Sequence, residues 1–146
     1  MDAIAEGKRL FGANCSACHQ TTGLGIAGAF PPIVGSEWVT GPEETVVRIL
    51  LNGLAGPMKV RGVAYNGAMP AWKESMSDEE ISYVITYIRQ WAPNAAPAVT
   101  SATVASFRKQ DAARAGPWTE GELKALEATP AAPTVAGAAP ASAGMR

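Results

Sequence analysis

Apolar residues recur at helical spacing in three segments of the chain, and each segment predicts an α-helix. The first helix covers Ile4–Asn14. The second begins near Pro42, which suits a first helical turn, and ends at Gly53, which readily adopts a left-handed helix terminus. The third begins at the capping box Ser77–Glu80 and continues at helical spacing until Pro93 stops it.

Gly7 lies on the predicted apolar face of the first helix, four residues before Phe11. Glycine costs about 0.5–1 kcal/mol in a helix interior relative to alanine, so its presence there needs a reason. We expect another helix to approach the backbone closely at this position. The alternative is a surface glycine that the helix tolerates.

Two segments between the helices lack helical spacing. Residues 20–38 contain so many glycines and prolines that a helix is excluded and a strand is disfavoured. A loop of this length fits a chain that wraps a flat ligand. Residues 54–66 instead place Val60, Val63 and Tyr65 around an Arg-Gly pair, which predicts a short β-hairpin near residues 58–65.

The character of the chain changes after Trp91, and we divide the chain there. Residues 1–92 are expected to form the main domain. Residues 93–128 are expected to form a helical C-terminal extension, in which Trp118 anchors the segment to another surface. This extension covers the domain or, alternatively, is an arm that binds a partner. Residues 129–146 are mostly Ala, Pro, Gly, Thr and Ser, which predicts a disordered tail.

Length and composition narrow the class of protein. The chain has 146 residues, of which 47% are hydrophobic and 17% charged, and its formal net charge is -1. It has no basic excess to neutralise phosphates, which argues against a nucleic-acid partner. The longest apolar stretch, Val46–Leu51, contains an arginine and is far shorter than the roughly 20 residues of a membrane-spanning helix. We therefore expect a soluble chain without a transmembrane segment.

Both cysteines and the only histidine lie in one short motif, Cys15-Ser16-Ala17-Cys18-His19. A structural zinc site needs four such ligands, and this chain supplies three. A thioredoxin-type cysteine pair needs a βαβ context, whereas the local pattern here is helical. Covalent haem attachment accounts for all three residues, because the two thiols add to the haem vinyl groups and the adjacent imidazole binds the iron. The motif thus predicts one covalent haem c.

Haem of this kind is attached on the far side of a membrane, although the N-terminus begins a helix and contains no secretory signal. We therefore expect a periplasmic or other extracytoplasmic protein whose signal peptide has been removed. Cysteines consumed as thioethers suit an oxidising compartment, because no free thiol remains to mispair.

A haem iron held by one histidine has a second axial position, which methionine, lysine, water or no ligand can occupy. Two of the five methionines are terminal, and Met76 lies beside a helix cap, where packing explains it. Met69 has the more suitable context, because glycine precedes it, Pro70 stiffens the chain after it and Trp72 can cover the haem face. Met58 is the alternative ligand, and either methionine could instead fill the core.

Several motifs follow one another in a fixed order between residues 3 and 92. They are Gly7 with Phe11, Cys15-Ser16-Ala17-Cys18-His19, Phe30-Pro31-Pro32-Ile33-Val34-Gly35, Gly67-Ala68-Met69-Pro70, and Ser77-Asp78-Glu79-Glu80-Ile81 leading into Tyr83-Val84-Ile85-Thr86-Tyr87-Ile88. In order and spacing this set resembles the class I family of c-type cytochromes. The resemblance implies an all-α class I cytochrome c fold, in which the N- and C-terminal helices cross around a covalently bound haem.

The resemblance also implies roles for single residues. Cys15 and Cys18 carry the haem, His19 is the proximal ligand of the iron and Met69 is the distal ligand. The carbonyl of Pro31 accepts a hydrogen bond from the His19 ring, which fixes the ring orientation and the ligand basicity. The expected residues of the haem pocket and its surroundings are Phe11, Pro31, Ile33, Tyr65, Trp72 and Tyr87, with Phe11 and Tyr87 at the helix crossing.

The family resemblance implies outer-sphere electron transfer, one electron at a time, between periplasmic redox proteins, and no enzymatic activity. Segment 56–67 is also similar to bacterial cytochromes that are subunits or domains of oxidases, reductases and dehydrogenases. A hetero-complex of that kind is therefore an expected partner. The candidate docking residues are Lys8, Lys59, Arg61 and Lys73, which would steer an acidic partner; ordinary solubility is the alternative explanation of these charges.

Two other functions fit the same residues. In a haem sensor or peroxidase, a small ligand would displace Met69, and the ferrous protein would bind carbon monoxide rapidly. In a non-redox interaction subunit, the haem would serve only as a folding core and the C-terminal extension would bind the partner.

Overall fold

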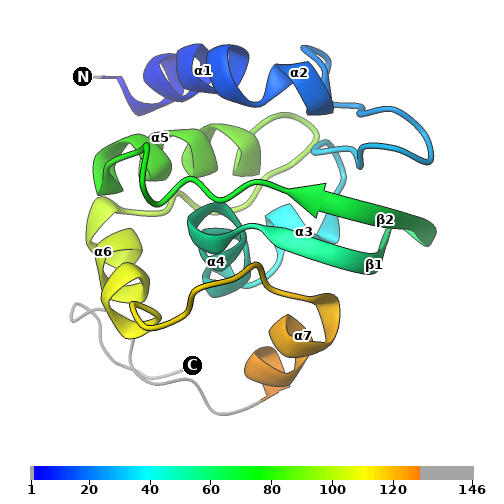
Figure 1. Cartoon of the computed structure of the whole chain (residues 1–146). Coiled ribbons are helices and arrows are strands. Elements are labelled where there is room, and N and C mark those ends of the chain that lie inside the picture. The colour runs from blue at the N-terminus through cyan, green and yellow to red at the C-terminus, as the bar shows by residue number, and fades with distance from the viewer. Residues whose placement is uncertain (1, 129–146) are drawn as a thin grey trace.

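The computed structural model describes residues 2–128, which fold into a helical protein with one small sheet (Figure 1). Its elements are α1 (Ala3–Asn14), α2 (Ser16–His19), α3 (Glu37–Thr40), α4 (Glu43–Asn52), β1 (Leu54–Val60), β2 (Val63–Met69), α5 (Asp78–Arg89), α6 (Ser101–Gln110) and α7 (Glu120–Ala128). The predicted fold class is confirmed. Met1 and segment 129–146, the predicted disordered tail, lie outside the described residues. Among residues 2–128, no helix is long and apolar enough to cross a membrane.

Helices α1 and α5 cross at Gly7 (Figure 1). A Cβ atom at this position would lie 2.1 Å from the carbonyl oxygen of Tyr83 and 2.6 Å from the Cβ of Tyr87. No side chain fits there, so the close approach that the sequence predicts is confirmed. The predicted capping box of Ser77 and Glu80 begins α5. This contact holds α1 against α5, and the cysteine motif follows directly after α1.

Strands β1 and β2 form an antiparallel hairpin that extends beyond the predicted segment 58–65 at both ends. Its two-residue turn has positive φ at Arg61 (53°) and Gly62 (80°), the arrangement that matches the twist of paired strands. Pairing with β2 outweighs the low strand propensity of Gly56–Pro57. The register places Met69 at the open end of the hairpin, opposite the first residue of β1.

The loop predicted over residues 20–38 ends two residues sooner than expected. The short helix α3 begins there because the Ser36 hydroxyl accepts a hydrogen bond from the backbone N–H of Trp38, a normal helix cap. Buried Asn94 holds the end of the loop by accepting from the N–H of Gly35 and donating to the carbonyl of Ile33. The loop is therefore fixed to the segment that follows α5.

The C-terminal extension packs against the rest of the protein: α6 lies against α4 and α5, and α7 lies against β1 (Figure 1). Between them, Trp118 is buried and pairs with the free edge of β1. Its backbone N–H donates to the carbonyl of Gly53 at 3.0 Å, and its carbonyl accepts from the N–H of Ala55 at 2.9 Å. These bonds cover the start of the strand edge, which would otherwise present unpaired backbone groups.

Candidate haem-binding site

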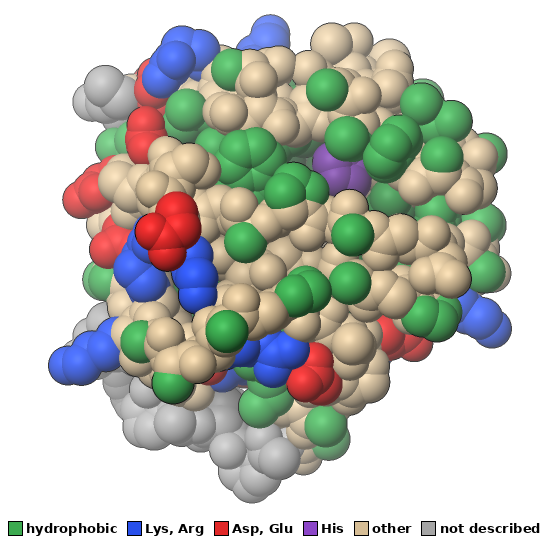
Figure 2. All heavy atoms as spheres, in the orientation of Figure 1, with side chains coloured by type: hydrophobic (Ala, Val, Ile, Leu, Met, Phe, Trp, Pro, Cys, Tyr) green, Lys and Arg blue, Asp and Glu red, His purple; other side chains and the backbone are tan. Residues whose placement is uncertain are grey.

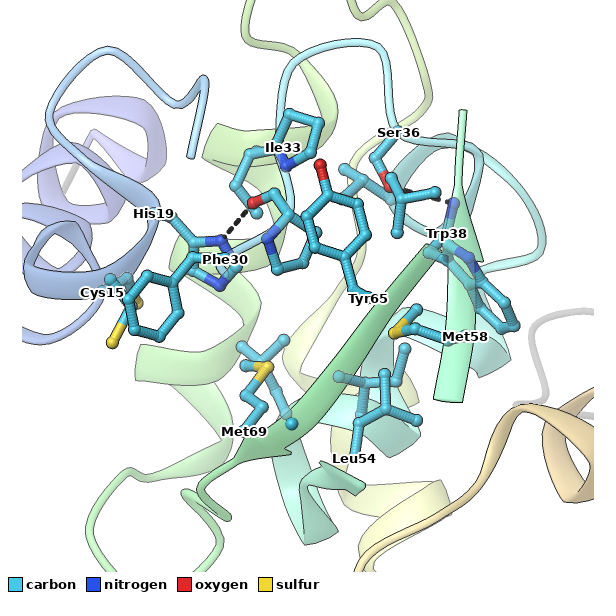
Figure 3. Close-up of a pocket in the computed structure, with 18 of the residues that line it drawn as sticks. Cys15, His19, Phe30, Ile33, Ser36, Trp38, Leu54, Met58, Tyr65 and Met69 are labelled. Carbon is cyan, nitrogen blue, oxygen red and sulfur yellow. Dashed lines mark hydrogen bonds between the residues drawn. The ribbon is translucent and has the colours of Figure 1, made fainter. Parts of the chain in front are cut away.

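An apolar cavity of about 180 Å³ lies between the α2 turn, the loop before α3, helix α4 and the hairpin (Figure 3). The predicted site residues that line it are Cys15, Cys18, His19, Pro31, Ile33, Met58, Tyr65, Met69 and Trp72. The fold thus brings together residues that the sequence places in separate segments.

The cysteine motif forms a tight helical turn at the cavity wall. The N–H groups of Cys18 and His19 both donate to the carbonyl of Cys15, at 3.2 and 2.9 Å. Both thiols and the imidazole therefore border the same space. Burial raises the pKa of the Cys15 thiol to about 11.

The His19 ring is buried, and its Nδ1 lies 2.8 Å from the carbonyl oxygen of Pro31 (Figure 3). A carbonyl oxygen only accepts hydrogen bonds, so Nδ1 carries the proton and Nε2 keeps a free lone pair. Burial lowers the pKa of His19, and the bond to Pro31 offsets part of that effect. The result is a neutral, oriented imidazole, the form that binds metal.

Two thioethers face the cavity from the hairpin, those of Met58 and Met69 (Figure 3). Met58 pairs with Tyr65 across the strands and packs only against the apolar cluster that contains Trp38 and Tyr65. Met69 packs against that cluster and also against the main core cluster, against which Cys15 packs as well. Met69, unlike Met58, therefore packs against the same core cluster as Cys15.

The backbone around Met69 is held from both sides. Gly53 ends α4 with a φ of 83°, and a Cβ there would lie 2.4 Å from the carbonyl oxygen of Met69. After Met69, the N–H of Trp72 donates to the carbonyl of Leu50 at 2.9 Å. The Met69 carbonyl and the chain that follows it thus lie against the end of α4, which orders the Met69 backbone.

Phe11 and Tyr87 do not line the cavity. They form an aromatic cluster with Trp91 at the crossing of α1 and α5, with ring centroids 5.1 to 5.9 Å apart. A Cβ at Gly23 would lie 2.8 Å from the Trp91 ring, so this cluster reaches the loop that follows His19.

Helix α4 supplies a wall of the cavity that the sequence analysis treats only as core. Val46, Ile49 and Leu50 all line the cavity. The signal was present in the sequence, because α4 carries apolar residues on more of its circumference than one buried stripe requires. A helix of that kind is buried on two sides.

The four candidate docking residues lie outside the cavity lining. Lys8, Lys59 and Arg61 are exposed, the first on α1 and the other two at the turn end of the hairpin. Lys73 is half-buried, and its Nζ donates to the backbone carbonyl of Arg114 at 2.9 Å. The Lys73 ammonium group is thus bonded to the C-terminal extension.

Comparison with known proteins identifies the class. A family model described as "Cytochrome C oxidase, cbb3-type, subunit III" matches residues 2–88. The chain belongs to this family of c-type cytochromes. Two proteins named cytochrome c-552 from Thermus thermophilus are each 41% identical to it, over 90 and 88 residues. These alignments cover 59% and 58% of the cytochrome and 60% and 66% of the relatives, so the chain spans less than two-thirds of the length of either relative.

A longer alignment joins the cytochrome to the gluconate 2-dehydrogenase cytochrome c subunit of Pantoea cypripedii. The two are 31% identical over 120 residues, which cover 78% of the cytochrome and 26% of that subunit.

The cytochrome binds covalent haem c with iron. The cavity fits this cofactor, because its walls are apolar and one turn presents two thiols and a neutral imidazole to it. The sequence-based prediction of the cofactor is therefore confirmed.

Proposed function

We propose that this cytochrome is a single-haem electron carrier whose iron is held by His19 and Met69. One observation carries the proposal: the imidazole of His19 and the thioether of Met69 face the same cavity, which Cys15 and Cys18 also border. An iron with two strong protein ligands exchanges electrons without binding a substrate. The proposed role is therefore outer-sphere transfer rather than enzymatic chemistry.

Each residue has its own part in this role. Cys15 and Cys18 would hold the haem through thioether bonds at the end of α1. The Pro31 carbonyl orients His19 and leaves Nε2 as the donor atom, and the thioether of Met69 favours the ferrous state. The apolar walls exclude water, which disfavours the more highly charged ferric state. When bound, the haem supplies the ferric–ferrous couple.

The proposed partners are periplasmic redox proteins, with the cytochrome as a shuttle or as a subunit of a larger complex that contains an oxidase, a reductase or a dehydrogenase. Two findings support this proposal. The matched family description names an oxidase subunit, and one relative is named as a cytochrome c subunit of a dehydrogenase. The covalent haem supports a periplasmic or other extracytoplasmic location, where such haem is attached.

Carbon monoxide binding to the ferrous protein separates an electron carrier from a haem sensor or peroxidase. If Met69 is the iron ligand, the form in which it has left the iron is populated below about 1%. Carbon monoxide then binds about 100-fold more slowly than it does to an iron with an open position. We expect Met69→Ala to bind carbon monoxide that much faster than the wild type, as measured by flash photolysis or stopped flow. Met58→Ala removes the other thioether of the same cavity and is expected to leave the rate unchanged.

Rapid binding to the wild type at the rate of Met69→Ala would contradict a Met69-ligated carrier and favour the sensor or peroxidase. If Met58→Ala accelerates carbon monoxide binding and Met69→Ala does not, the iron ligand is Met58 instead.

A further inference from the structure

Residues 70–77 join Met69, the last residue of β2, to the start of α5, and we call them the Met69 connection. The N–H of Met76 donates to the carbonyl of Trp72 at 2.9 Å, which closes a turn in this segment. The N–H of Trp72 donates in turn to the carbonyl of Leu50 in α4. Because Met69 is continuous with this segment, movement of the Met69 connection away from the protein would draw the thioether out of the cavity.

One side chain of the C-terminal extension, that of Arg108 in α6, binds both the Met69 connection and the first residue of α5. Its Nη1 and Nη2 atoms donate to the backbone carbonyls of Lys73 and Met76, at 2.6 and 2.9 Å. Its Nε atom donates to the Asp78 carboxylate at 2.7 Å. Hydrogen bonds from a charged donor are stronger than those between neutral groups. A single guanidinium therefore holds the second half of the Met69 connection against α6.

This contact lies where α6 packs against α5 (Figure 1). Figure 2 shows basic and acidic side chains gathered at the left of its view, in the region of these two helices. The side chains of Arg108 and Asp78 are each 30% exposed, so water screens the ion pair only in part.

The extension holds the Met69 connection at a second place. The Nζ of Lys73 donates to the backbone carbonyl of Arg114 at 2.9 Å, and the side-chain amide of Asn52 donates to the same carbonyl at 3.2 Å. The Met69 connection, α4 and the extension thus meet at one oxygen atom. Arg108 and Arg114 both lie beyond residues 2–88, which the family model matches. These contacts are therefore made by a part of the chain outside that match.

We propose that Arg108 is a positioning residue for Met69: it keeps the Met69 connection closed and thereby keeps the thioether at the iron. The hydrogen bonds of Arg108 exist only while the connection is closed, so they lower the population of a locally opened form. Arg108 itself lies outside the cavity lining, so it acts through the backbone and not by touching the cofactor. The inference rests on the proposed ligation by Met69 and adds a residue that determines how rarely this ligand leaves.

Carbon monoxide binding to the ferrous holoprotein measures the opened form, because carbon monoxide reaches the iron only after Met69 has left it. We expect Arg108→Met to bind carbon monoxide about tenfold faster than the wild type in stopped flow. The substitution keeps the aliphatic stem and removes three hydrogen bonds from the closed form. Lys73→Leu removes one hydrogen bond and is expected to accelerate binding about threefold.

Arg114→Met is the matched control. The side chain of Arg114 is 25% exposed, and its guanidinium also donates to two backbone carbonyls and one carboxylate. These acceptors belong to Gly116, Pro117 and Glu122, which all lie in the extension. The substitution removes a similar set of bonds and leaves the backbone carbonyl that binds Lys73. We expect it to change the rate of carbon monoxide binding less than about twofold.

A double variant shows whether Arg108 acts through Met69. Arg108→Met added to Met69→Ala is expected to bind carbon monoxide at the rate of Met69→Ala alone, because no thioether remains to be released. Hydrogen exchange at the backbone amide of Met76 in the wild-type holoprotein and the single variants gives a second readout, which needs no added ligand. We expect this amide to exchange about tenfold faster in Arg108→Met and at the wild-type rate in Arg114→Met.

Equal rates of carbon monoxide binding in Arg108→Met and the wild type, or equal acceleration by Arg108→Met and Arg114→Met, would overturn the positioning role. Acceleration by Arg108→Met in the Met69→Ala background would also overturn it, since the arginine would then control access to the cavity. If the wild type binds carbon monoxide as fast as Met69→Ala, ligation by Met69 fails and the positioning role fails with it. The exchange of the Met76 amide would still show, in that case, whether Arg108 holds the Met69 connection.

Discussion

Gly7 and Gly53 let the backbone pass where no side chain fits, and both positions determine the shape of the haem site. Gly7 brings α1 against α5. Gly53 lets the end of α4 approach the carbonyl of Met69. At both positions the missing Cβ is what allows the contact, because the nearest atom is a backbone carbonyl oxygen, which cannot move aside as a flexible side chain would.

Gly7→Ala tests the helix crossing. A Cβ at 2.1 Å from the Tyr83 carbonyl forces α1 and α5 apart, and we expect a loss of about 3 kcal/mol in the free energy of unfolding. Gly12→Ala is the control, because Gly12 lies on the same helix with no atom near the added Cβ. It is expected to gain about 0.5–1 kcal/mol from helix propensity.

Denaturant unfolding of the two ferric holoproteins, followed by circular dichroism, measures both changes. Equal stability of Gly7→Ala and Gly12→Ala would mean that the helices do not touch at Gly7.

The sequence predicts single residues best where their chemistry is rare in the chain. Two cysteines and one histidine in one motif have few uses, and haem attachment explains all three. The hydrogen bond from Lys73 to the Arg114 carbonyl could not be predicted, because it joins residues that are far apart in the chain. The choice of Met69 over Met58 as the iron ligand is a prediction from local context, since glycine precedes Met69 and Pro70 and Trp72 follow it.

At the scale of elements, the C-terminal extension is joined to α4 through a buried arginine. The guanidinium of Arg48 lies 4.8 Å from the ring centroid of Phe107 and 5.7 Å from that of Trp118. It also binds the Asp111 carboxylate at 2.8 Å. We propose that residues 93–128 stabilise the haem-bearing residues 1–92 through these contacts, rather than serving as an arm for a partner.

Asp111→Asn tests the anchoring of the extension. Removing this carboxylate leaves much of the buried charge of Arg48 without compensation, and we expect a loss of about 2–4 kcal/mol in the free energy of unfolding. The double variant with Arg48→Met removes both charges and is expected to recover most of that loss. Thermal and denaturant unfolding of the holoproteins provide the measurement. If the double variant is less stable than Asp111→Asn alone, the ion pair is not what anchors the extension.

Elements were predictable where local pattern and tertiary packing agree. Helices α1, α4 and α5 form where the apolar spacing predicts them, but α5 ends at Arg89, earlier than the stop at Pro93 that the sequence predicts. The hairpin was predicted only at its centre, because its outer pairs depend on contacts with the end of α4 and with Trp118. Contacts of this kind arise between distant segments and leave no local periodicity.

At the scale of the whole molecule, two segments without charged residues, 10–36 and 64–72, border the haem cavity. Four segments of chain meet around the cavity, and no Asp, Glu, Lys or Arg is among the described residues that line it. The order of the motifs along the sequence predicts a single fold that brings these segments together. The absence of charge over residues 10–36 is visible in the sequence, but only the fold shows that this segment and residues 64–72 border the same site.

The optical spectrum of the ferric protein tests the central claim most directly, together with a pyridine haemochrome assay on the same sample. Attachment through Cys15 and Cys18 predicts a haem with two thioether bonds, and ligation by His19 and Met69 predicts a weak far-red band from sulfur-to-iron charge transfer. This band should persist in Met58→Leu and vanish in Met69→Leu. A far-red band that survives in Met69→Leu, or that is absent from the wild type, would contradict the proposed coordination of the iron.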